Sequence, residues 1–77
     1  ALDSVIVLCE EQGDTFHLGS AFNARGLYHA QLGEKEAMLA DLSRCLSTAR
    51  GLGQVTLERI AERNLAEYLF LMDDLDA

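Results

Sequence analysis

The stretch "GLYHAQLGEKEA", residues 26–37, decides the fold, because it contains the end of one helix, a short turn and the beginning of the next helix. Apolar and small residues continue up to Leu32, and Gly33 is typical of a helix C-terminus. The acids Glu34 and Glu36 suit the positive end of the helix that follows. A connection this short makes the two helices pack antiparallel.

The same alternation of helix and glycine turn extends through the chain. Leu2, Val5, Ile6 and Cys9 recur at i, i+3, i+4 and i+7, which is the spacing of one helix face. No segment alternates with period two far enough to predict a strand. We therefore expect an all-α fold of antiparallel helix hairpins, with helices at about 1–12, 15–32, 34–50 and 55–72.

Composition and charge narrow the functional classes. The chain has 77 residues, of which 49% are hydrophobic, and it contains no proline, which indicates one small globular unit. Its 13 acids and 6 bases give a net charge of −7. This balance argues against nucleic acid and against an anionic membrane surface as partners. It indicates a solvated helical exterior, or a preference for a basic partner.

Cys9 and Cys45 are the two cysteines, and no CxxC motif is present. This pattern predicts buried free thiols in a reducing compartment, so we expect a cytoplasmic protein. No apolar run is long enough to span a membrane, and residues 4–9 lack the basic flank of a signal peptide.

A shift of 40 residues superposes the chain on itself. It places "GLYHAQLGEKEA" on "AEYLFLMDDLDA", residues 66–77, and pairs small with small, apolar with apolar and acid with acid. Gly26 and Ala66 become equivalent, and small residues there would allow a close helix approach; Ala37 and Ala77 are expected to do the same on the opposite helix. Leu42 and Leu65 lie on the apolar stripes of the third and fourth helices and are expected in the core.

The pattern A-x-x-x-G-x-x-x-x-x-x-G-E-x-x-A at 22–37, with Phe22 in the opening aromatic place, resembles a tetratricopeptide repeat (TPR). The stretch "RNLAEYLFLMDDLDA", residues 63–77, resembles it more closely, and the spacing matches the longer variety of about 40 residues. Arg25 and His29 depart from the family pattern, which has leucine and an aromatic there. A HEAT-like helical repeat is the structural alternative.

The resemblance implies a fragment of a right-handed superhelical solenoid. Residues 1–12 would be the second helix of a partial repeat, 15–51 a full repeat, and 54–77 the first helix and the start of the second helix of the next repeat. Because "LMDDLDA" corresponds to "QLGEKEA", we expect the sequence to be an excerpt of a longer array.

No catalytic, cofactor-binding or metal-binding constellation is predicted. His17 and His29 are too far apart for a helical metal pair, and neither cysteine has an adjacent base. The acids at 73, 74 and 76 lack the spacing of an EF-hand loop. We therefore expect a non-enzymatic protein without cofactors.

The first helix of each hairpin would line a concave groove for a peptide or partner domain. The family resemblance places Asn64 where a groove asparagine holds a peptide backbone. The other candidates share its face of the helix or the matching face one repeat earlier: Arg63, Glu67, Phe70, Asn23, Leu27 and Gln31. The alternative is that these residues are solvated or packed against another repeat.

The predicted function is a protein–protein interaction module within a larger cytoplasmic regulatory or signalling protein, such as a bacterial regulator. The alternative is a sensory or self-assembly segment that binds a small peptide, an effector or itself and switches an attached output domain. Apolar residues at both chain ends, 5–8 and 69–72, favour self-association.

Overall fold

The computed structural model describes the backbone of residues 2–76 and the side chains of residues 2–72. Its four helices are α1 (Leu2–Gln12), α2 (Thr15–Gln31), α3 (Lys35–Leu52) and α4 (Val55–Asp76), and the described backbone contains no strand. The predicted all-α class is confirmed. The first three helices begin and end within two residues of the predicted bounds.

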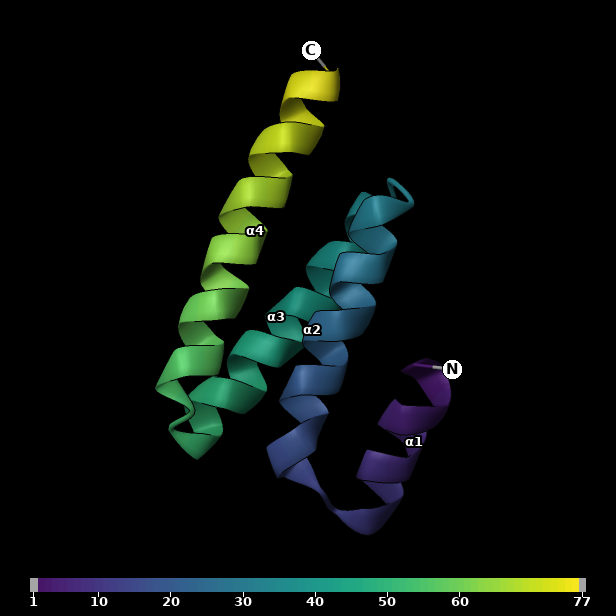
Figure 1. Ribbon diagram of the computed structural model, residues 1–77, viewed down its shortest axis with the longest axis vertical. Coiled ribbons are helices and arrows are strands. Elements are labelled where there is room, and N and C mark those ends of the chain that lie inside the picture. Colours follow the sequence, from purple (N-terminus) through teal and green to yellow (C-terminus); the bar gives the residue numbers. More distant parts are fainter. Residues whose placement is uncertain (1, 77) are drawn as a thin grey trace.

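The helices form an elongated, thin molecule of 42 × 26 × 13 Å. Figure 1 shows α2 and α3 as a central antiparallel hairpin, with α1 beside α2 and α4 beside α3. Helix α4 also contacts α2, and its last turns extend past the connection between α2 and α3. The chain therefore offers one face shared by α2 and α4 and another shared by α1 and α2.

Three equivalent glycine turns connect the helices. Gly13, Gly33 and Gly53 have φ angles of +67°, +74° and +69°, a region where a side chain would be strained. After each glycine, the next backbone N–H donates to the carbonyl five positions earlier: Asp14 to Cys9 at 2.8 Å, Glu34 to His29 at 2.9 Å and Gln54 to Ala49 at 2.9 Å. These bonds satisfy carbonyls that the helix ends would leave open.

The fourth turn that the repeat predicts does not form. Helix α4 continues to Asp76, so the expected helix end at about Met72 and the new helix start within 73–77 are wrong. The position equivalent to Gly33 is Asp73, and a left-handed residue with a Cβ atom costs roughly 1–2 kcal/mol. Without a glycine or proline in this stretch, nothing in the local sequence ends the helix.

Two buried clusters hold the helices together. The first joins all four helices through Ile6, Ala21, Phe22, Cys45 and Ala61. The second lies between α2, α3 and α4 and contains Ala30, Met38, Leu42 and Met72. Both cysteines are free and buried, as their pattern predicts.

The predicted packing residues have different surroundings. Leu42 is fully buried, and a Cβ atom added to Gly26 would lie 2.9 Å from the Leu42 side chain, so α2 and α3 are in close contact there. Leu65 is half-buried and packs against the second cluster, and Ala37 is half-buried.

Ala66 is exposed because no helix of the described chain covers that side of α4, so its role in a close helix approach stays a prediction. Ala77 lies outside the described residues.

Candidate functional site

The face shared by α2 and α4 carries the predicted groove residues, and two of them are in direct contact. Asn64 Nδ2 on α4 donates a hydrogen bond to Asn23 Oδ1 on α2 at 3.1 Å. Both residues are half-buried. The amide pair therefore joins two helices from residues 41 positions apart.

The other predicted groove residues surround this pair more loosely. Arg63, Glu67 and Phe70 are exposed on successive turns of α4, with Phe70 at 66%. On α2, Leu27 is half-buried and Gln31 is exposed. Within residues 2–72, no hydrogen bond or ion pair connects these five side chains to the amide pair.

An apolar hollow lies about one helical turn before the amide pair, where α2 and α4 begin. Gln54 Nε2 donates to the carbonyl oxygen of Phe16 at 3.2 Å and ties the two helix starts together. The lining residues are Phe16, Ser20, Gln54, Val55, Thr56, Leu57 and Ile60. Sequence reasoning missed this hollow; the signal was that Phe16 and Ile60 are large apolar residues outside the main helix stripes.

Two unpaired arginines extend this surface along α4. Arg59 and Arg63, one turn apart, flank Ile60 in a shallow hollow. Neither arginine has a hydrogen bond or ion pair within residues 2–72, whereas Arg50 pairs with Glu58 and Glu62. The other residues that line this hollow, Thr56 and Ile60, are uncharged, so the two arginines are its charged groups.

A second candidate site centres on Arg25, at the junction of α1, α2 and α3. Its guanidinium donates to both carboxylate oxygens of Asp41, from Nε at 2.7 Å and from Nη2 at 2.7 Å. Nη1 donates to Asp3 on α1 at 2.9 Å. Asp41 is 3% exposed, so the charged pair with Arg25 satisfies a carboxylate that burial would otherwise destabilise.

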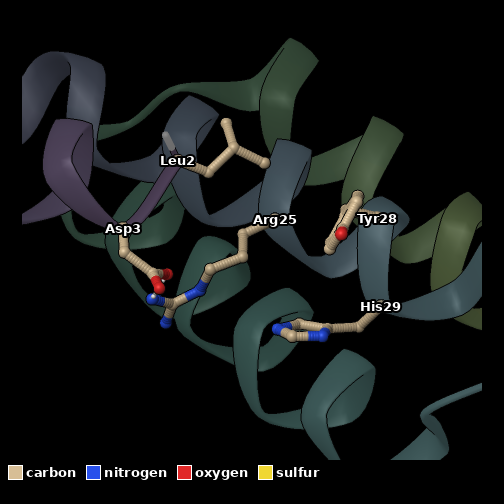
Figure 2. A pocket seen from close by; sticks show the side chains of 5 residues that line it. All are labelled: Leu2, Asp3, Arg25, Tyr28 and His29. Atoms are coloured by element: carbon tan, nitrogen blue, oxygen red, sulfur yellow. Dashed lines mark hydrogen bonds and ion pairs between the residues drawn. The ribbon is translucent and has the colours of Figure 1, made fainter. Parts of the chain in front are cut away.

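A pocket of about 380 Å³ opens beside this ion pair and is lined by Leu2, Asp3, Arg25, Tyr28 and His29. Figure 2 shows the Asp3 carboxylate at the end of the Arg25 side chain, with Tyr28 and His29 along the same helix. Its charged and imidazole groups already have protein contacts, Arg25 with Asp3 at 2.9 Å, and His29 with Glu34 at 2.7 Å and with Asp41 at 3.6 Å, so three carboxylates adjoin the pocket. The arrangement stabilises the packing of α1, α2 and α3 more than it offers a free binding group.

This network was missed at the sequence level, although part of the signal was visible. Arg25 and His29 stand out as departures from the family pattern, and they lie on one side of α2 because they are one turn apart. Asp41 interrupts the apolar stripe of α3 between Met38 and Cys45. Opposite charges on two helices that pack together could form an ion pair, but only the tertiary structure shows that Arg25 and Asp41 meet.

Three shifted pKa values reflect these surroundings. The hydrogen bonds to Asp41 raise the pKa of Arg25, so its charge is fixed. Burial raises the pKa of the Cys45 thiol, and a contact with the Asn23 backbone opposes this shift only in part. The His17 side chain and backbone N–H lower the pKa of Asp14, which caps the start of α2.

No family model matches the sequence, and neither a curated protein nor a solved structure matches it. Among the described residues, no helix is long and apolar enough to cross a membrane. The same residues contain no group of three His, Cys, Asp or Glu side chains arranged to hold a metal ion.

Proposed function

We propose that this chain is a non-catalytic protein–protein interaction module of the TPR-like kind, within a larger cytoplasmic regulatory or signalling protein. The face shared by α2 and α4 binds an extended peptide or a segment of a partner domain. The observation that carries this proposal is the hydrogen bond between Asn23 and Asn64, which holds two amide groups on a surface flanked by apolar and positively charged side chains.

The amide pair has the hydrogen-bonding capacity that an extended peptide needs. One bond joins the two side chains, so the Asn64 oxygen, its second N–H and the Asn23 NH₂ group keep donors and acceptors for a ligand. A peptide backbone presents one N–H and one carbonyl at every residue. The pair is therefore suited to hold a backbone independently of its sequence.

The surroundings of the pair give the peptide its side-chain preference. Phe16 and Ile60 expose apolar surface in the nearby hollow, at 65% and 37% of their areas. Arg59 and Arg63 lie next to Ile60 and lack carboxylate partners within residues 2–72. A peptide that carries an apolar residue followed by a carboxylate would fill both places.

The experiment is a selection of displayed random peptides against the immobilised 77-residue chain, followed by fluorescence anisotropy with a selected peptide. We expect sequences that combine apolar and acidic residues. Asn64→Ala and Arg63→Ala should each weaken binding by about tenfold, corresponding to roughly 1.4 kcal/mol. Arg44→Ala is the matched control, since Arg44 is an exposed arginine on α3 above the Phe22 ring.

Circular dichroism must show unchanged helicity for each variant. Selected peptides that bind Asn64→Ala and Arg63→Ala as tightly as the parent chain would refute the groove assignment. The alternative function, a self-assembly segment, is favoured by large apolar side chains that are exposed on α1 and α4, among them Val5, Leu8 and Phe70.

A further inference from the structure

We draw no further inference here: the strongest candidate, the pocket at the junction of α1, α2 and α3 that is lined by Leu2, Asp3, Arg25, Tyr28 and His29, belongs to the ion-pair network already described, whose charged and imidazole groups are held by contacts within the chain.

Discussion

The guanidinium of Arg25 on α2 donates two hydrogen bonds of 2.7 Å each to the carboxylate of Asp41 on α3. The Asp41 side chain is 4% exposed and the Arg25 side chain 20% exposed, so the pair is largely removed from water. Asp3 on α1 adds a third bond to the same guanidinium at 2.9 Å. One arginine side chain therefore connects three of the four helices.

Replacing one member of this pair should destabilise the fold strongly. Asp41→Ala leaves the Arg25 charge in a low-dielectric site without its main partner, and the expected loss is about 3–5 kcal/mol in the free energy of unfolding. Urea denaturation followed by circular dichroism measures this loss. Asp3→Ala is the matched control, since the Asp3 side chain is 79% exposed and its removal should cost less than about 1 kcal/mol.

Replacing both members together should have a much smaller effect. The double variant Arg25→Leu/Asp41→Leu removes two desolvated charges at once, and such exchanges are often neutral or stabilising by about 1–4 kcal/mol. The difference between the double variant and the sum of the single variants gives the coupling energy. Additive losses in this cycle would contradict a coupled buried pair.

Replacing either of two helical glycines by alanine should change the free energy of unfolding, but in opposite directions. A Cβ atom at Gly26 would lie 2.9 Å from Leu42, so Gly26→Ala should cost about 1–3 kcal/mol through overpacking, more than its gain in helix propensity. At Gly51, no atom lies within 4 Å of the added Cβ atom and the backbone is helical, so Gly51→Ala should stabilise by up to about 1 kcal/mol. Thermal unfolding of both variants distinguishes the signs, and equal shifts would contradict the close contact of α2 and α3.

Stability should fall at alkaline pH because of Cys45. Burial raises the pKa of this thiol in the folded chain, whereas the unfolded chain exposes a thiol with a pKa of about 8.5. Above that pH the unfolded state loses its proton first and gains stability, so the contribution of Cys45 is complete below about pH 8.5 and is lost as the pH rises toward the folded pKa. Urea denaturation between pH 7 and 10 measures this decline.

Cys45→Ala should show a shallower decline over the same range, although it also loses packing in the first cluster. This comparison separates the Cys45 thiol from every other group, because the two chains share all the others. Identical slopes for the parent and the variant would contradict the role of Cys45.

Truncating a core leucine should reveal how completely α3 is enclosed. Leu42 is fully buried in the second cluster, so Leu42→Ala should lower the free energy of unfolding by about 2–5 kcal/mol. Leu32 is 57% exposed, and Leu32→Ala should change the free energy of unfolding by less than about 0.5 kcal/mol. Similar losses at both positions would mean that the second cluster is not a tightly packed core.

Much of the helical framework could be predicted because its causes are local. The apolar period of 3.6 residues defines the helices, and the glycines at 13, 33 and 53 end them by adopting left-handed backbone conformations. The same reasoning failed at residue 73, where the repeat suggested a turn but the position holds aspartate instead of glycine. Similarity between repeats was a weaker guide there than the conformational preference of the residue itself.

The candidate site could be predicted only in part. The repeat placed Asn23 one position away from the equivalent of Asn64, and no local pattern shows that the two amides touch. Asp41 was visible as an acid in an apolar stripe, without any indication that Arg25 would reach it. Ala66, which the repeat placed in a close contact, is exposed because no helix of the described chain covers that side of α4.

By itself, the sequence determined where the helices lie and where glycine turns end them, because these features depend on interactions within a few residues. The tertiary structure decided which side chains meet across long separations: Arg25 with Asp41, 16 positions apart, and Asn23 with Asn64, 41 positions apart. It also decided which faces remain open on α1 and α4. These outcomes depend on the packing distances and relative rotation of whole helices, which the periodicity of one helix does not specify.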